Sequence, residues 1–243
     1  MLLAIDIGNS RIKVAVFEKD TEISNYSFLK EEAFKNFKKI FKNHPKINHA
    51  VSSSVGNLDT ICHNYIKTKA NLTEIDANTT FPFQNLYSTP KTLGVDRMVV
   101  TAGASLLYPN QNVLIIDCGT CITYDLLTNK NTYLGGAISP GLTMRYKSLH
   151  TYTAKLPLLE KSYPDSFIGN STNQSIHSGI INGISNEIEG CISQYSLKFS
   201  DLTIILTGGD AIFLAKSLKS TIFVRSNFLL ESLNKLFNYL EKN

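Results

Sequence analysis

The sequence is poor in cysteine and has no long apolar run. The spacing of its four cysteines gives no disulfide framework of the kind found in small secreted domains. No apolar segment approaches the roughly 18 residues that span a bilayer, and Asp6 interrupts the opening MLLAI before it could serve as a secretory leader. We therefore expect a soluble protein of the cytoplasm.

Two of the cysteines, Cys118 and Cys121, form a CxxC pair. A structural zinc site needs a second pair of Cys or His ligands, and only Cys62 has a histidine next to it. A thioredoxin-like pair opens a helix, whereas this pair straddles the expected tip of an apolar hairpin. We therefore expect neither zinc binding nor redox chemistry from this motif.

A large excess of charge is also absent. The net charge of +4 is too small to indicate a nucleic-acid surface. Much of the lysine excess lies in EEAFKNFKKIFK, residues 31–42, where apolar residues recur at helical spacing, and this pattern is typical of an amphipathic helix with a solvated face. We expect no nucleic-acid partner and no membrane partner.

Apolar patterning in the first part of the chain predicts the element order βββαβαβ. The expected elements are strands over 2–7, 11–18 and 22–29, a helix over 31–43, a strand around 50–51, a helix up to Lys69 and a strand near 72–76. A helix is expected from Gly94 to Tyr108, after a loop rich in Asn, Thr and Pro.

The same pattern returns in the second part of the chain. LLAIDIGNSRIKVAVF aligns with VLIIDCGTCITYDLL at an offset of 111 residues, which pairs Asp6 with Asp117, Gly8 with Gly119 and Asn9 with Thr120. Each copy is followed by a third strand, a helix and an apolar strand that ends in small polar residues. The repeat predicts two copies of one α/β unit, 1–111 and 112–243, that face each other across a cleft.

A long helix is expected over 171–198, where isoleucines and a tyrosine form one stripe. Gly179 and Gly183 on this helix cost stability unless something packs closely against them. The isoleucine stripe is consistent with a core helix of the second domain, and also with a contact between two copies of the chain.

The polar tips of the two hairpins suggest phosphate binding. Gly8 and Gly119 have no Cβ, so main-chain N–H groups there can approach phosphoryl oxygens closely, and Lys13 supplies a point charge. Asp6 and Asp117 would repel phosphate unless a cation lay between, which implies bound metal, with Mg²⁺ and its water shell at one of them. The alternative is that each Asp is an ordinary turn residue.

The chain contains no GxxxxGK[ST] segment, so it does not bind phosphate through a P-loop. The nearest glycine-rich alternative is Thr207-Gly208-Gly209-Asp210, between a strand and a helix. It is suited to an adenosine or ribose contact at a helix N-terminus, and equally to a bare strand-to-helix turn.

Five blocks, in order along the chain, resemble the type III pantothenate kinases, within the superfamily of actin, heat-shock chaperones and sugar kinases. They are Asp6-Ile7-Gly8-Asn9-Ser10 through Lys13, Gly94-Val95-Asp96-Arg97, Asp117-Cys118-Gly119-Thr120, the segment from Gly135 to Gly141 with Thr153–Pro157, and Gly169-Asn170-Ser171-Thr172. The resemblance implies two duplicated ribonuclease H-like domains and ATP-dependent phosphorylation of pantothenate, the first step of coenzyme A biosynthesis.

The resemblance also implies roles for matched positions. ATP would be bound by Thr120 and by the segment Asp6, Ile7, Gly8, Asn9, Ser10, Arg11, Ile12 and Lys13. Pantothenate would contact Tyr87, Gly94, Val95, Asp96, Arg97 and Thr172. Asp96 would accept the hydroxyl proton, Asp6 would organise Mg²⁺ through water, and Asp117 would hold a monovalent cation, K⁺ or NH₄⁺. The family forms homodimers, so a homodimer is expected.

The residues of the acceptor block agree with these roles. Phosphoryl transfer through a loose transition state needs an oriented hydroxyl more than a deprotonated one, so a fixed Asp96 suffices. Arg97 offers a fork suited to the pantothenate carboxylate. The alternative is that Asp96 and Arg97 pair with each other at a helix start. Val95 stands where the family often has Ala, which bears on packing more than on chemistry.

Two other functions are compatible with the same fold. Proteins that resemble these kinases include regulatory accessory factors, which bind nucleotide without transferring phosphate. An actin-like filament or a chaperone ATPase is a third possibility, but the chain is short for either.

Overall fold

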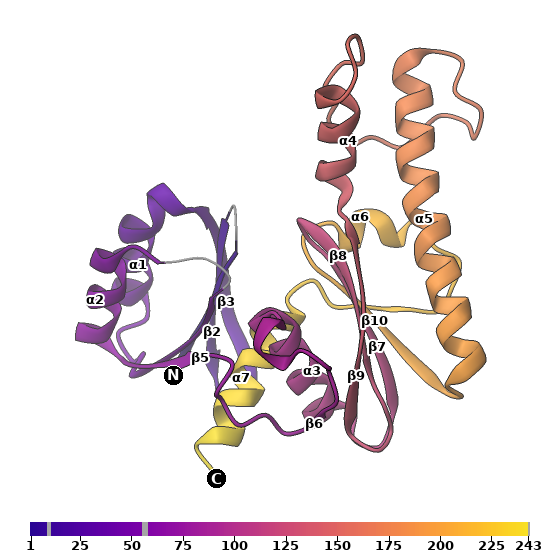
Figure 1. Ribbon diagram of the computed structural model, residues 1–243. Coiled ribbons are helices and arrows are strands. Elements are labelled where there is room, and N and C mark those ends of the chain that lie inside the picture. The colour runs from indigo at the N-terminus through magenta and orange to yellow at the C-terminus, as the bar shows by residue number, and fades with distance from the viewer. Residues whose placement is uncertain (9–10, 55–57, 243) are drawn as a thin grey trace. The chain divides into compact units, whose positions relative to one another are not determined.

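The computed structural model describes residues 1–8, 11–54 and 58–242. The chain divides into two compact units, each built around its own sheet (Figure 1). The first unit comprises Met1–Pro109, Asn131–Tyr133 and Asn227–Asn243, and the second comprises Asn110–Lys130 and Leu134–Ser226. Among the described residues, no helix combines the length and the apolar character needed to cross a membrane.

Five strands form the first sheet in the order β3-β2-β1-β4-β5. They are β1 (Leu2–Ile7), β2 (Arg11–Glu18), β3 (Thr21–Leu29), β4 (His49–Ser54) and β5 (Asn71–Ile75). The first three are antiparallel neighbours, whereas β4 and β5 join in parallel. Parallel strands need long crossovers, which α1 (Ala33–Asn43) and α2 (Thr60–Lys69) provide. The predicted βββαβαβ order is confirmed.

The second sheet repeats this order as β9-β8-β7-β10-β11. Its strands are β7 (Asn112–Cys118), β8 (Cys121–Leu127), β9 (Thr132–Pro140), β10 (Leu202–Thr207) and β11 (Phe223–Val224). The short β6 (Gln84–Asn85) pairs with Thr132 and Tyr133 at the start of β9. The crossovers carry α4 (Leu142–Thr151), α5 (Thr172–Lys198) and α6 (Ala211–Ala215). The duplication inferred from the hairpins therefore extends to the topology of both units.

The two faces of the first sheet pack against different helices, because side chains alternate along each strand. Leu3, Ile5 and Ile7 of β1 face α1 and α2 and form one core cluster with them. Leu2 and Ala4 belong to a second cluster with α3 (Val95–Leu107) and α7 (Phe228–Leu240). Asp6 has the same parity as Leu2 and Ala4, so it lies on the face that α3 covers.

The closing helix α7 packs with α3 in the first unit, although 112–243 was expected to form one domain. Its apolar stripe, Leu230, Leu233, Leu236 and Phe237, is buried in the cluster on the α3 face of the first sheet. The two helices approach so closely that a Cβ on Gly103 would collide with Ser232. An apolar stripe predicts a helix, but it does not predict which sheet the helix covers, so the boundary differs from the expected one.

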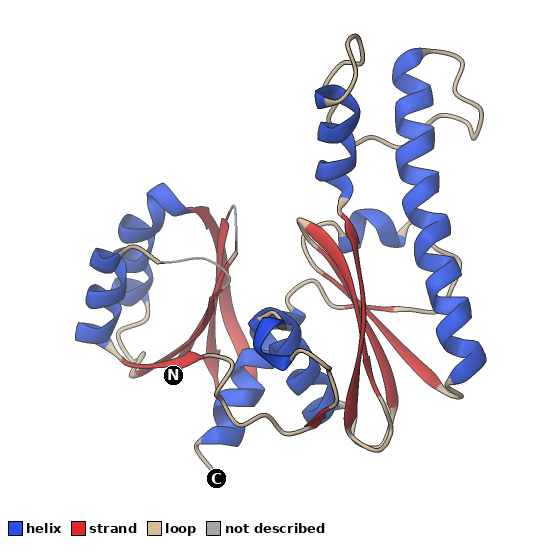
Figure 2. Cartoon of the chain, in the orientation of Figure 1, coloured by secondary structure: helices blue, strands red, loops and turns tan. Residues whose placement is uncertain are grey.

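In the second unit, the expected isoleucine helix is present as α5 (Figure 2). Its isoleucines are buried against β7, β8 and β10, which confirms the core-helix interpretation of the stripe. The helix α4, which sequence patterning did not predict, runs beside the first half of α5, and both extend past the ends of the strands (Figure 1). A hydrogen bond of 2.8 Å between Tyr146 Oη and His177 Nδ1 joins them.

Candidate active site

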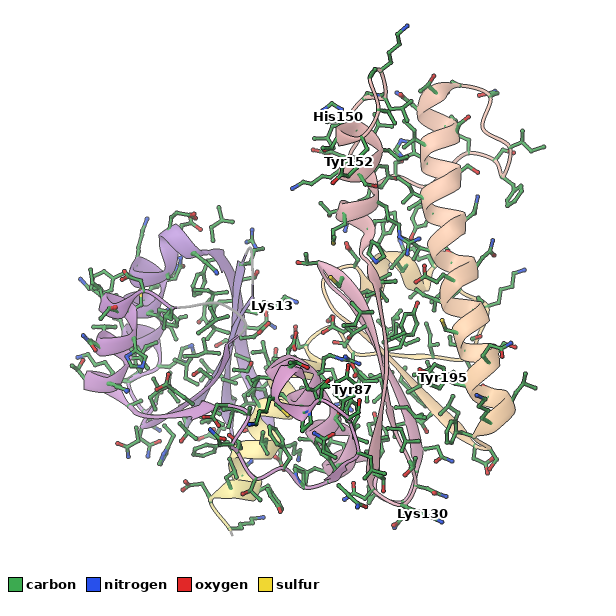
Figure 3. All side chains as sticks on the ribbon, in the orientation of Figure 1. Lys13, Tyr87, Lys130, His150, Tyr152 and Tyr195 are labelled. Atoms are coloured by element: carbon green, nitrogen blue, oxygen red, sulfur yellow. The ribbon has the colours of Figure 1, made fainter. Side chains whose placement is uncertain are left out.

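Asp6 and Lys13 lie opposite each other in the first sheet. They are partners in the antiparallel register of β1 and β2, which places both side chains on one face. This is the face covered by α3, and Lys13 is labelled on its strand in Figure 3. A carboxylate and an ammonium group are therefore held side by side at the end of β1, where the strand turns.

Asp96 reaches the same place from the first turn of α3. Its Oδ1 accepts a hydrogen bond of 2.8 Å from the main-chain N–H of Arg97. A Cβ on Gly94 would collide with this Oδ1, so any other residue at position 94 would make the Asp96 carboxylate turn away from this position. A carboxylate in the first turn is also favoured by the helix dipole.

The electrostatics of Asp6 show that these three groups are neighbours. Burial raises the pKa of Asp6 from 3.8 to about 6; the Lys13 ammonium lowers it and the Asp96 carboxylate raises it. At neutral pH the ionised Asp6 is therefore held in an unfavourable environment. A bound cation would relieve this cost, because it favours the charged form.

Ser53 lies next to Asp6 on the other side of β1, since the two are partners in the parallel register of β1 and β4. Its side chain is 1% exposed, and within the described parts of the chain its Oγ has no hydrogen-bond partner. A buried hydroxyl without a partner is costly, so this oxygen is suited to a water molecule of a hydrated ion. The donor set fits Mg²⁺, which keeps several waters.

No cluster of three or more His, Cys, Asp or Glu side chains suited to a metal occurs in residues 1–8, 11–54 and 58–242. Any cation at Asp6 would therefore complete its shell with water or with phosphate oxygens. This is the usual arrangement for Mg²⁺ that accompanies a nucleotide.

The other residues of the first hairpin have different positions. Ile7 and Ile12 are buried in the cluster under α1 and α2, so only their main chain is available to a ligand. The Arg11 guanidinium is bound to Ser27, at 2.9 Å to Oγ and 3.0 Å to the carbonyl oxygen. The N–H of Gly8 donates to the Arg11 carbonyl at 3.1 Å. Asn9 and Ser10 lie outside the described residues.

The second unit places Asp117 in the position that corresponds to Asp6. It pairs with Thr123 of β8 and with Thr207 of β10, as Asp6 pairs with Lys13 and Ser53. A Cβ on Gly208, whose φ is +97°, would collide with Asp117 Oδ1 and with the Cys118 carbonyl. The predicted glycine-rich turn therefore closes directly over this carboxylate.

Thr120 is exposed at the tip of the second hairpin. The N–H of Gly141 donates to its carbonyl oxygen at 3.1 Å. A Cβ on Gly141 would collide with the carbonyl oxygens of Gly119 and Thr120, so the end of β9 lies directly against this tip.

The acceptor residues of the first unit also lie together. The Arg97 guanidinium is 5.8 Å from the centre of the Tyr87 ring, and it is buried. Tyr87 in turn lies against Tyr133, with ring centres 6.1 Å apart. Val95 is half-buried and packs at this aromatic cluster. Thr172 begins α5 in the second unit and is exposed.

Comparison with known proteins identifies the family. The family model for type III pantothenate kinase matches residues 2–194. The chain belongs to the type III pantothenate kinase family. A type III pantothenate kinase of Flavobacterium johnsoniae is 51% identical over 239 residues, with 98% of each chain covered. Another, from Bacteroides fragilis strain YCH46, is 38% identical over 247 residues, again with 98% of each covered.

Solved structures show the fold of this family member. A protein from Campylobacter jejuni described as a Baf family transcriptional activator has a TM-score of 0.63 at 20% identity, with 99% of this chain and 100% of that chain covered. A glucokinase from an Antarctic psychrotroph has a TM-score of 0.51 at 12% identity, with 98% of each covered. The expected duplicated, ribonuclease H-like architecture is confirmed.

In this pantothenate kinase family member, Ser53 lies beside Asp6 although no motif singled it out, and Thr207 was expected only as the start of the glycine-rich segment 207–210. The sequence shows only that both occur where an apolar strand ends in small polar residues. Strand register provides the missing information, because it places each beside the hairpin aspartate of its own sheet.

Proposed function

We propose that the chain transfers the γ-phosphoryl group of ATP to the primary hydroxyl of pantothenate, which yields 4′-phosphopantothenate for coenzyme A biosynthesis. Family membership supports this reaction. The observation that carries it in this chain is the convergence of Asp96, Asp6 and Lys13 on one face of the first sheet. Phosphoryl transfer needs a group that orients the acceptor, a metal ligand and a phosphate-binding cation.

Asp96 orients the pantothenate hydroxyl and accepts its proton. The hydrogen bond from the Arg97 N–H fixes one carboxylate oxygen, and the other oxygen remains to accept from the substrate. A loose transition state places little demand on the basicity of this group. Fixed geometry is therefore its main contribution.

Lys13 and the main chain of the Gly8 turn bind the ATP phosphates, and Thr120 contributes a second nucleotide contact. Mg²⁺ near Asp6 would neutralise part of the phosphate charge when it is bound. Asp6 is suited to this role because burial makes its own charge unfavourable without a cation, and Ser53 provides a hydroxyl for the ion's water shell.

Asp117 holds a monovalent cation, K⁺ or NH₄⁺. Its partner across the hairpin is Thr123, so the position that Lys13 occupies in the first unit is filled here by a neutral hydroxyl. The carboxylate and the nearby Cys118 carbonyl are oxygen ligands, which hard cations prefer.

Pantothenate is recognised by its carboxylate. We assign this contact to the Arg97 guanidinium, whose planar fork matches a carboxylate. The Tyr87 ring lies beside this guanidinium and limits its orientation. Gly94 and Val95 line the acceptor position through the main chain at the start of α3. The family resemblance adds Thr172 as a further pantothenate contact.

The chain acts as a homodimer through the exposed side of α5. Gly179, Gly183 and Gly190 lie at spacings that repeat along one helix face, and a Cβ on any of them would meet nothing within 4 Å. Glycine within a helix costs about 1 kcal/mol relative to alanine. A second copy packed closely against this smooth face would offset that cost.

The decisive experiment measures ATP consumption with and without pantothenate for the wild type, Asp96→Asn and Asp59→Asn. Asp59 is a matched control, because it also lies at a helix start in the first unit and accepts a main-chain N–H, from Ile61. We expect pantothenate-dependent turnover, a fall in kcat of at least about 100-fold for Asp96→Asn, and unchanged kcat for Asp59→Asn.

Two outcomes would contradict this assignment. ATP consumption that does not depend on pantothenate would exclude the reaction, and nucleotide binding without turnover would favour a regulatory factor instead. Full activity of Asp96→Asn would exclude Asp96 as the group that orients the hydroxyl.

A further inference from the structure

The Glu187 carboxylate of α5 accepts hydrogen bonds from side chains of three other elements of the second unit. The Tyr124 hydroxyl of β8 donates to Oε1 at 3.1 Å, the Ser139 hydroxyl of β9 donates to the same oxygen, and the Arg145 guanidinium of α4 donates to Oε2 at 2.5 Å. Burial raises the pKa of Glu187, but the bonds from Arg145 and Ser139 outweigh it and lower the pKa below its ordinary value. The carboxylate is therefore ionised at neutral pH.

Arg145 has a second partner at the end of β9. Its Nε donates to the Pro140 carbonyl oxygen at 2.9 Å, while Nη2 binds Glu187. The two ion-paired side chains are largely buried, with 22% and 29% of their surfaces exposed. A planar guanidinium can donate to two acceptors in this way. A lysine ammonium on its flexible stem would hold the Pro140 carbonyl and the Glu187 carboxylate less firmly.

The segment that Arg145 holds lies against the tip of the second hairpin. Gly141 follows Pro140, its N–H donates to the Thr120 carbonyl, and a side chain at this position would collide with the tip. The end of β9 therefore limits the position of residues 119–120. The ion pair in turn fixes the end of β9, because Arg145 links Pro140 to Glu187 of α5.

We infer that Arg145 and Glu187 are positioning residues for nucleotide binding, acting through Pro140 and Gly141 on Thr120. This inference rests on the proposed function, in which Thr120 contacts ATP. Neither Arg145 nor Glu187 needs to touch the nucleotide. Loss of one partner leaves a buried charge uncompensated, so the end of β9 shifts and the hairpin tip loses its support.

The test compares Arg145→Gln and Gly141→Ala with the control Glu189→Gln. Glu189 also lies on α5 and accepts hydrogen bonds, but from the Lys219 and Ser220 main chain and the Ser220 hydroxyl. We expect the first two variants to raise the KM for ATP and the Kd of a non-hydrolysable ATP analogue by roughly fivefold to tenfold, the loss of about one hydrogen bond. The KM for pantothenate should stay within about twofold of wild type, since the Tyr87–Arg97 contacts are untouched.

If Arg145 and Gly141 had only a structural role, their substitution would lower Tm without weakening the binding of ATP. Glu189→Gln should lower Tm as Arg145→Gln does, yet leave ATP binding unchanged. In a Thr120→Ala background, Arg145→Gln should add little further loss of ATP affinity, because both changes act on one contact. Additive losses, or wild-type ATP affinity in Arg145→Gln and Gly141→Ala, would overturn the inference.

The binding measurement also separates this inference from the proposed reaction. If the wild type binds the ATP analogue but shows no pantothenate-dependent turnover, the proposed function fails. The positioning role is then still decided by whether Arg145→Gln weakens binding of the analogue.

Discussion

Replacing Asp6 by Asn is expected to stabilise the metal-free protein at neutral pH while removing its activity. The wild-type side chain has a pKa of about 6 in the folded state, against an ordinary value of 3.8 for an aspartic acid. A group with a raised folded pKa contributes stability that is fully present below the unfolded pKa and is lost as the pH rises through the folded pKa. For Asp6 the loss therefore occurs between about pH 4 and pH 6.

The magnitude follows from the size of the shift. Each pKa unit corresponds to about 1.4 kcal/mol, so a shift of about two units corresponds to about 3 kcal/mol of unfolding free energy. Asn cannot ionise and lacks this pH dependence. The difference in stability between variant and wild type should therefore grow in favour of the variant by up to about 3 kcal/mol from pH 4 to pH 8.

The assay is thermal unfolding of both proteins from pH 4 to pH 8, with a chelator present and no nucleotide. All other groups titrate in both proteins, so the difference reports residue 6 together with its electrostatic coupling to Lys13 and Asp96. A gain of 3 kcal/mol corresponds to a rise in Tm of roughly 6–12 °C for a chain of this size. Parallel curves over the whole pH range would refute the environment assigned to Asp6, and retained activity of the variant would refute its role beside the metal.

Three further predictions concern packing and recognition. Gly103→Ala should lower stability by about 1–3 kcal/mol, because the added Cβ collides with Ser232, and Ser232→Gly should restore part of the lost Tm. Asn131→Ala should raise the KM for pantothenate while the KM for ATP stays unchanged, because the Asn131 amide donates to the Pro82 carbonyl at 2.5 Å and so holds the segment before Tyr87. If the proposed homodimer forms through α5, Gly183→Leu should sediment as a monomer and the wild type as a dimer; a dimeric variant would exclude this face of α5 as the interface.

Local patterns were sufficient for α5 and for the strands other than β6, which lies in the segment expected to be a loop, because burial on one side imposes a period of two or of 3.6 on the apolar residues. The helix α4 was missed for a physical reason. Its sequence, LTMRYKSLHT, contains only two buried residues, Leu142 and Tyr146, and its N-cap Gly141 makes no side-chain cap hydrogen bond. Its helical pattern is short, with Leu142, Tyr146 and the partly buried Leu149 at helical spacing, and no side-chain capping signal precedes it.

Some site residues could likewise be identified from local sequence, and others could not. Asp6, Lys13 and Asp96 were identified through motifs, and the structure places them within electrostatic reach of one another. Ser53 and Glu187 were not identified, because their roles depend on neighbours distant in sequence. Ser53 becomes informative only through the register of β1 and β4, and Glu187 only through the packing of α4 on α5.

The two hairpin turns differ in length, and this difference decides which side chain lies opposite the aspartate of each unit. In the first turn the Gly8 N–H reaches the carbonyl of Arg11, whereas in the second the Gly119 N–H reaches that of Cys121, one residue sooner. The residue opposite the aspartate is therefore Lys13 in one half and Thr123 in the other.

The first half thus carries a counter-ion for its aspartate within the chain itself, the Lys13 ammonium, which is present under all solution conditions. The second half has a neutral hydroxyl at the matching place, and under the proposed function it takes its counter-ion from the surrounding solution. A change of turn length after gene duplication would then make the second half depend on a dissolved monovalent cation, at the place where the first half has the fixed charge of Lys13.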